Sequence, residues 1–236
     1  MNIDAIRCAL PDRQIDYHLT IDSTMRAAAG LPVGSIVLAG EQTAGQGRHG
    51  HTWHSEPGAG IYCSMVLHPA PVLTLAIGLA AVEAITEATG QVCDLRWPND
   101  LMLGGKKCAG ILVQLVDGLA IAGIGINVNH TAFPLNLSAE ATSLKLETGR
   151  EICPTDIVIA LIPAIERLAS LPPEDVLDLF THASSYASGR RVVVHQPDGD
   201  VYGVTAGLDP AGFLKLRQDD GTYTLILAGG VRAAGS

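Results

Sequence analysis

Cationic residues and closely spaced cysteines are scarce in this sequence of 236 residues. It has 15 Lys and Arg against 24 Asp and Glu, a formal net charge of −9, which argues against a chain-wide basic surface for nucleic acid. Its five cysteines are scattered, and none belongs to a C-x-x-C pair. We therefore expect reduced thiols rather than a disulfide framework.

The sequence also lacks the marks of a secreted or membrane protein. Its first twenty residues contain no basic segment followed by an apolar run, so no signal peptide is predicted. The apolar stretch at residues 72–85 contains Glu83 and is too short to span a membrane. Hydrophobic residues still make up 47% of the chain and charged residues 17%, a balance typical of a protein with a substantial core. We expect a soluble, cytoplasmic protein without a membrane partner.

Hydrophobic periodicity predicts an α+β fold, in which a mixed sheet is backed by helices. Strands are expected at residues 15–22, 35–41, 61–68, 92–97, 101–116 and 119–129. Helices are expected at residues 23–30, 72–90, 155–170 and 173–187, with a short helix and a turn before residue 15. Two dipeptides are typical of hairpin turns: Gly104 with Gly105, and Asp117 with Gly118.

Ser188 and Gly189 mark a change of pattern. After them come short alternating strands, separated by turn signals at Asp198 with Gly199, at residues 210–212, and at Asp220 with Gly221. We therefore divide the chain into a larger domain at residues 1–188 and a small β-barrel at residues 189–236.

The stretch T-A-G-Q-G-R-H-G-H-T-W at residues 43–53 contains the pattern G-x-G-x-x-G. A dinucleotide-binding turn would need a helix after these glycines and an acidic residue ~20 positions on, and neither is present. A functional loop fits better, because its glycines let backbone amides approach an anion, Arg48 adds donors for phosphate, and Trp53 can stack on a base. The spacing of His49, His51 and His54 matches no common zinc pattern, so no metal site is expected.

Three further stretches carry polar groups at positions suited to a ligand. Asp22, Ser23 and Thr24 stand at a helix start, where they serve either a polar ligand or a plain helix cap. In R-W-P-N-D-L-M-L-G-G-K-K-C-A-G-I-L, residues 96–112, an amide and a carboxylate follow a strand, and Lys107 heads an apolar strand. In G-I-G-I-N-V-N, residues 123–129, Asn127 is a polar group in an apolar run that needs a partner.

Taken together, in this order and at these separations, the four motifs resemble those of the biotin–protein ligases. The resemblance is strong from Tyr17 to Asn129, and the part after Gly189 resembles the SH3-like C-terminal domain of that family. It implies a ligase that converts biotin and Mg-ATP into biotinyl-5′-adenylate and pyrophosphate. The biotinyl group then passes to one lysine of a biotin carboxyl carrier protein domain.

The resemblance also assigns residues to roles. It implies catalytic roles for Lys107, Arg48 and Asp100. It places biotin against Ser23, Thr24, Met25, Gln42, Gly45, Gln46, Gly47, Arg48, Lys107 and Gly110. It places ATP and the adenylate against Arg48, His51, Trp53, Asn99, Asp100 and Asn127. No protein ligand for a resident metal is implied.

The chain departs from the family pattern at three positions. Gln46 and His51 stand where the family often has Arg or Lys, so the resemblance does not carry over the strength of phosphate binding by this loop, although it does carry over the fold. Gly230 stands where the family usually has an acidic residue, so no contact from that residue is expected.

Alternatives of the same fold are a lipoate–protein ligase or an octanoyltransferase, which lack this loop and the W-P-N-D run. A non-enzymatic regulator that senses biotin is a third alternative. About 16 residues precede Tyr17, too few for a helix-turn-helix module. We therefore expect the short form of the ligase, without DNA as a partner. The sequence leaves monomer and homodimer both open.

Overall fold

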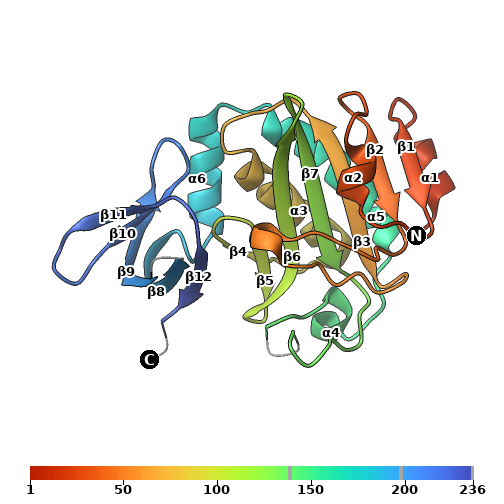
Figure 1. Cartoon of the computed structure of the whole chain (residues 1–236). Coiled ribbons are helices and arrows are strands. Elements are labelled where there is room, and N and C mark those ends of the chain that lie inside the picture. The colour runs from red at the N-terminus through yellow and green to blue at the C-terminus, as the bar shows by residue number, and fades with distance from the viewer. Residues whose placement is uncertain (138–139, 197–198, 235–236) are drawn as a thin grey trace.

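A seven-stranded mixed sheet forms the centre of the larger domain in the computed structural model, which describes residues 1–137, 140–196 and 199–234 (Figure 1). The strand order is β1-β2-β3-β7-β6-β5-β4. Only β1 and β2 run parallel, and the other neighbours are antiparallel. The strands are β1 (Ile15–His18), β2 (Ile36–Ala39), β3 (Gly60–Leu67), β4 (Asp94–Arg96), β5 (Asp100–Leu103), β6 (Lys106–Val116) and β7 (Leu119–Asn127).

Both hairpin turns expected from the sequence are present. Asp117 and Gly118 have φ angles of 49° and 81°, and Gly104 and Gly105 have 58° and 79°. Positive φ at both central residues is the geometry of a two-residue hairpin whose twist matches its strands. These turns place β5, β6 and β7 side by side in the sheet.

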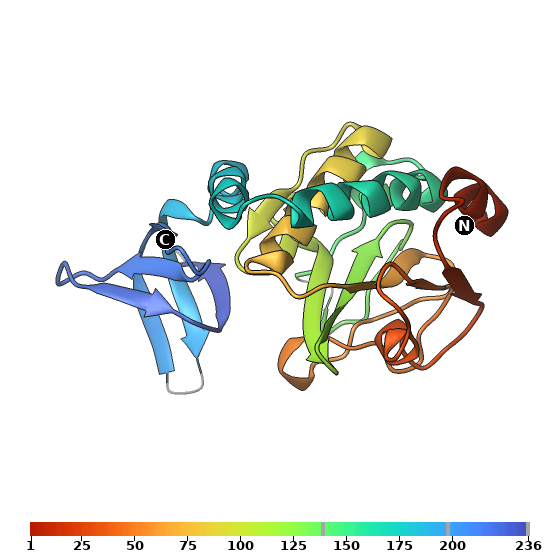
Figure 2. The same cartoon turned by 90° about the horizontal axis from the view of Figure 1, so that it is seen from above.

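The helices cover the two faces of the sheet unequally, as Figure 2 shows. The long helices α3 (Leu73–Thr89) and α5 (Pro154–Ala169) pack on one face and on each other, with α1 (Ile3–Ala9) and α6 (Pro173–Ala183) beside them. On the other face lies α2 (Thr24–Ala28), where Met25 packs with Val37, Val66 and Ile121. The rest of that face is left to loops, and the candidate site forms there. No helix in the described part of the chain has both the length and the apolar character that a membrane span requires.

The SH3-like C-terminal domain is a five-stranded antiparallel sheet in the order β11-β10-β9-β8-β12. Its strands are β8 (Ser188–Gln196), β9 (Gly199–Leu208), β10 (Leu214–Arg217), β11 (Tyr223–Ile226) and β12 (Gly230–Ala233). The turns expected at residues 210–212 and at Gly221 are present, with φ of 85° at Gly212 and 86° at Gly221. The turn expected at Asp198 lies outside the described residues. The two domains are joined by a hydrogen bond in which Nε1 of Trp97 donates to the carbonyl oxygen of Gly212 at 2.9 Å.

Several boundaries differ from the sequence expectations. The first strand ends at His18 rather than at residue 22, and beyond it only Ile21 still pairs, in an isolated bridge with Gln42. Helix α6 ends at Ala183, four residues early. The sequence analysis missed α4 (Leu144–Thr148), a single turn capped by the hydroxyl of Ser143.

Candidate active site

The glycine-rich loop between β2 and β3 folds back on itself over the open face of the sheet. The amide of Gly47 donates to the carbonyl oxygen of His51 at 2.7 Å, and the amide of Trp53 donates to that of Gly45 at 2.9 Å. A Cβ on Gly45 would lie 2.7 Å from the carbonyl oxygen of Trp53, so the close approach of the two loop arms requires glycine there. One turn of 3-10 helix at Arg48–Gly50 forms the tip. No long helix follows, which agrees with the rejection of a dinucleotide-binding turn.

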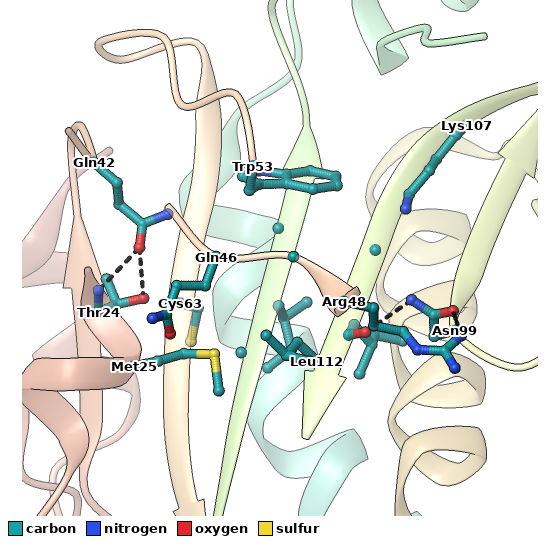
Figure 3. A pocket seen from close by; sticks show the side chains of 16 residues that line it. Thr24, Met25, Gln42, Gln46, Arg48, Trp53, Cys63, Asn99, Lys107 and Leu112 are labelled. Atoms are coloured by element: carbon teal, nitrogen blue, oxygen red, sulfur yellow. Dashed lines mark hydrogen bonds between the residues drawn. The ribbon is translucent and has the colours of Figure 1, made fainter. Parts of the chain in front are cut away.

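A cavity of about 50 Å³ lies beneath this loop, against β3, β6 and β7 (Figure 3). Its lining joins segments that are far apart in the sequence. The residues that line it are Thr24, Met25, Gln42, Gln46, Gly47, Arg48, Trp53, Cys63, Asn99, Lys107, Gly110, Ile111, Leu112, Gly123, Ile124 and Gly125.

The indole of Trp53 closes the cavity, and two glycines make room for it. A Cβ on Gly110 would lie 2.9 Å from the ring, and a Cβ on Gly125 would collide with it outright. The ammonium of Lys107 lies 5.3 Å from the centre of the ring, within the range of a cation–π contact. Nε1 of Trp53 is buried and has no hydrogen-bond partner among the described residues. The ring is therefore well packed, and its indole N–H remains free to donate a hydrogen bond.

One end of the cavity is uncharged and polar. Oε1 of Gln42 accepts hydrogen bonds from the amide and the hydroxyl of Thr24, at 2.9 and 3.1 Å, and its Nε2 donates to Ser55 Oγ at 3.0 Å. Ser64 in turn donates to the hydroxyl of Thr24 at 2.8 Å. Next to this network the hydroxyl of Ser23 is buried and has no partner in the described part of the chain. Buried hydroxyls are seldom left unpaired, so this end is suited to a ligand that carries both donors and acceptors.

The other end of the cavity is cationic. Nη1 of Arg48 donates to Asn99 Oδ1 at 2.9 Å, and Nδ2 of Asn99 donates to the carbonyl oxygen of Ile111 at 3.0 Å. The guanidinium of Arg48 is therefore fixed to the start of β5, with Lys107 nearby from β6 (Figure 3). Burial lowers the pKa of Arg48, partly offset by the charge of Asp100.

Behind these cations, Asp100 holds two of them in place. Its carboxylate contacts Lys107 Nζ at 2.5 Å and Arg96 Nη2 at 2.7 Å. Burial alone would raise the pKa of Asp100, but the charges and hydrogen bonds of Lys107 and Arg96 outweigh it, and the pKa lies below its usual value. Asp100 thus pairs with Lys107 and Arg96, while Arg48 is held by the neutral amide of Asn99, and the excess positive charge favours anionic ligands.

A second, larger hollow of about 540 Å³ adjoins the cationic end. It shares Arg48 and Asn99 with the first cavity and extends to Gly212 and Phe213 of the C-terminal domain. Arg48 can therefore be reached from the side on which the two domains meet.

The structure brings most of the residues expected for the site together. Those that line the small cavity are Thr24, Met25, Gln42, Gln46, Gly47, Arg48, Trp53, Asn99, Lys107 and Gly110. Ser23, Gly45 and Asp100 do not line it. Gly45 pairs with Trp53 and Asp100 with Lys107, which both line it, whereas the hydroxyl of Ser23 has no partner among the described residues. His51 and Asn127 do not line it either: His51 is exposed, and Nδ2 of Asn127 donates to the carbonyl oxygen of Thr142 at 3.0 Å. The ligand contacts of all these residues stay predictions.

The sequence analysis did not single out the walls of the cavity. These are Cys63, Ile111, Leu112, Gly123, Ile124 and Gly125. Side chains alternate between the two faces of a strand. Taking every second residue of β6 and β7 as facing the loop could have identified several of these wall residues. Burial raises the pKa of Cys63 to about 12, so this residue is a neutral thiol and acts as part of an apolar wall.

Two regions of the chain match known protein families. Residues 13–130 match the Biotin/lipoate A/B protein ligase family, and residues 187–231 match the Biotin protein ligase C terminal domain. The first region contains the seven-stranded sheet and the cavity, and the second contains β8 to β11 and the start of β12.

Individual proteins resemble most of the chain. The Bifunctional ligase/repressor BirA of Bacillus subtilis is 34% identical, over 87% of this chain and 70% of its own length. The Biotin--[acetyl-CoA-carboxylase] ligase of Mycobacterium tuberculosis is 32% identical, over 92% of this chain and 88% of its own. A biotin protein ligase from Aquifex aeolicus, solved in complex with biotin and ATP, superposes with a TM-score of 0.84 at 27% identity, covering 93% of this chain and 97% of that one.

Proposed function

Since this chain belongs to the Biotin/lipoate A/B protein ligase family, we propose that it is a biotin–[biotin carboxyl carrier protein] ligase. It activates biotin with ATP as biotinyl-5′-AMP and transfers the biotinyl group to a lysine of a carrier domain. The observation that carries this proposal is the polarity of the small cavity. A polar, uncharged end at Thr24 and Gln42 suits the ureido ring of biotin, apolar walls suit its hydrocarbon tail, and Arg48 and Lys107 suit its carboxylate.

In the first step, a carboxylate oxygen of biotin attacks the α-phosphorus of ATP, and pyrophosphate leaves. Two anions must approach each other, so the barrier depends on cations that hold them in line and offset the developing charge. Arg48 and Lys107 stand where they can do this. Asp100 is fully engaged with Lys107 and Arg96, so we assign it the positioning of Lys107 rather than proton transfer.

In the second step, the neutral amine of the acceptor lysine attacks the acyl carbon of the adenylate, and AMP leaves. The adenylate must be protected from water until the carrier arrives, and the loop at residues 43–56 covers the cavity in the way that this requires. The hollow beside Arg48 and Asn99 provides an opening of the size that ligand pockets usually have.

The small cavity must enlarge before biotin can enter. Its volume of about 50 Å³ is far below the roughly 300–1,000 Å³ typical of ligand pockets. Trp53 occupies the space over Gly110 and Gly125, so we propose that its indole shifts when biotin binds and then covers the ligand. Lid closure of this kind is common where an intermediate must be kept from water.

Magnesium enters this scheme as part of the Mg-ATP substrate. Among the described residues that line the cavity there is no carboxylate, and Asp100 behind it is paired with two cations. Magnesium prefers carboxylates, phosphate oxygens and water. The residues present therefore offer it no free ligand, and we derive no step from a protein-bound ion.

We also propose a cytoplasmic location and the division into domains at residues 1–188 and 189–236. All five cysteines are free, and even Cys93 and Cys108, whose sulfur atoms lie 3.6 Å apart, are not bonded. The second sheet begins with β8 at Ser188, which supports the domain boundary. The carrier domain is the expected partner, while assembly into a homodimer stays open.

Mass spectrometry of a carrier domain tests the function directly. After incubation with the protein, biotin and Mg-ATP, the carrier should gain one biotinyl group on one lysine. A matched incubation with lipoate or octanoate should give no adduct. Lipoyl or octanoyl transfer without biotinylation would replace the proposal with the alternative activity of this fold.

A further inference from the structure

A group of side chains of the types that ligate metals lies outside the cavity, where the carboxyl end of the glycine-rich loop meets the segment after β7. His54, Glu56 and His130 each present one ligand atom, and these three atoms lie within 4.8 Å of one another. The rings of His54 and His130 have centroids 5.9 Å apart. His130 also stacks on Phe133, with centroids 5.1 Å apart, which restrains its ring.

The hydrogen bonds around His130 determine which of its nitrogens is available. Tyr62 donates its hydroxyl proton to the carbonyl oxygen of Glu56 at 2.8 Å. Nε2 of His130 lies 3.4 Å from the same hydroxyl oxygen, which can therefore only accept a hydrogen bond from it. Nε2 therefore carries the proton in the neutral imidazole, and the lone pair is on Nδ1. That nitrogen is buried, in a side chain with 0% exposure, and has no partner among the described residues.

This assignment leaves one nitrogen of His130 with a free lone pair for coordination. A histidine that binds a metal donates its far N–H to a fixed acceptor, which sets the tautomer and leaves the other nitrogen free to coordinate.

We propose that His54, Glu56 and His130 form a binding site for a divalent transition-metal ion, of which zinc fits best. Two imidazoles and one carboxylate are a common zinc ligand set, with a fourth position open to water. Zn–N distances of about 2.0–2.1 Å in a tetrahedron put the ligand atoms about 3.3 Å apart. A short inward movement of His54 and Glu56 toward the restrained ring of His130 is sufficient.

A bound ion would join the end of the loop to the segment after β7. The neighbouring residue of the loop is Trp53, the side chain that closes the cavity, so the ion would restrain the lid at its carboxyl end. The sequence analysis expected no metal site because it considered only the spacing of the three histidines in the loop. The third proposed ligand, His130, comes from a distant part of the chain.

Metal binding to the tag-free, chelator-treated protein tests the proposal without biotin or ATP. Calorimetric titration with ZnSO₄ should show one saturable site per chain. With cobalt, the visible spectrum should show tetrahedral d–d bands without a thiolate charge-transfer band, since the two exposed cysteines, Cys8 and Cys153, are not ligands. Because the readout involves neither substrate, its failure would leave the ligase assignment standing, and a failed ligase assay would not affect it.

Three variants make the test specific. His54→Phe keeps a ring against Phe133 and His130 but removes the nitrogens, and Glu56→Gln keeps the shape but removes the charge. Each should weaken zinc binding by more than about tenfold. The matched control is His49→Asn, an exposed histidine of the same loop outside the cluster, whose φ of 55° asparagine tolerates. Absence of a one-to-one site, a thiolate band with cobalt, or equal affinity in all three variants would overturn the proposal.

Discussion

Replacing Asp100 with asparagine tests the charge arrangement at the cationic end. The change keeps the shape of the side chain but removes the charge that pairs with both Lys107 and Arg96. Removing one partner of a buried ion pair costs about 3–5 kcal/mol, because the remaining charge stays buried. The side chain of Lys107 is 28% exposed and can turn toward water, so we expect the lower value, about 3 kcal/mol.

A loss of this size should be visible in thermal unfolding. For a chain of this length, 1 kcal/mol corresponds to roughly 2–4 °C in Tm, so Asp100→Asn should lower Tm by about 6–12 °C at pH 7. Asp219→Asn is the matched control, because it breaks an ion pair with Arg191 whose side chains are both more than half exposed. Exposed pairs contribute little, so its Tm should hardly change.

The dependence on pH has a definite sign. The pKa of Asp100 is lower in the folded protein than its reference value of 3.8. Its stabilising effect is therefore present above that reference value and is lost as the pH falls through the folded pKa. The difference in Tm between wild type and Asp100→Asn should shrink at acidic pH, since a protonated aspartic acid resembles asparagine. A difference that stays constant down to pH 2, or a variant as stable as Asp219→Asn, would refute the reasoning.

Asp100→Asn also distinguishes a role of Asp100 in positioning Lys107 from a role in binding the substrate. If Asp100 acts by holding Lys107, Asp100→Asn should lower kcat for pyrophosphate release by about tenfold or more and change KM for biotin less. A rise in KM alone, with kcat unchanged, would show that Asp100 contributes only to substrate binding.

Four further predictions concern the loop and the cavity. Lys107→Ala should nearly abolish pyrophosphate release while the circular dichroism stays unchanged, and release near the wild-type rate would remove Lys107 from the reaction. Gly125→Ala should displace the indole of Trp53, shift its fluorescence and raise KM for biotin about tenfold, as expected for an overpacked contact of 1–3 kcal/mol; an unchanged spectrum and KM would mean that the ring does not rest there. Trypsin should cut at Arg48 in the free protein, and biotin with ATP should protect this site, since ligand contacts must offset the entropy of ordering the loop; equal cutting in both states would indicate a rigid loop. If His51 contacts a phosphate, His51→Arg should lower KM for ATP because arginine places a permanent charge at that position; an unchanged KM would exclude the contact.

The features that the sequence predicts well depend on local geometry. Asp117 with Gly118, and Gly104 with Gly105, require positive φ whatever surrounds them, and both turns form where expected. The glycine-rich loop is likewise correct as a loop, because its lack of helical periodicity is a local property. Helix α4 is missed because a single turn leaves almost no periodic signal, although its Ser143 cap is visible in the sequence.

Features that depend on contacts between distant segments could not be predicted. Nothing local to Gly125 shows that an indole from residue 53 lies over it. The contact of Asp100 with Lys107 depends on an irregular register between β5 and β6, which shifts between Leu101 and Met102. The sequence identifies both charged residues as candidates, but only the pairing of the strands shows that one anchors the other.

The hydrogen bond from Trp97 to Gly212 gives the C-terminal domain a mechanical role. Trp97 is buried and stands two residues before Asn99, the partner of Arg48. Gly212 lies against Val72 and Leu75 at the start of α3. The small domain therefore contacts both helix α3 and the segment between β4 and β5 that contains Trp97 and Asn99. We therefore expect a change at Gly212 that breaks this hydrogen bond to be felt at Asn99, two residues along the chain from Trp97, and so at its partner Arg48. A substitution in the second domain at this contact would then change the reaction without altering any group that touches a substrate.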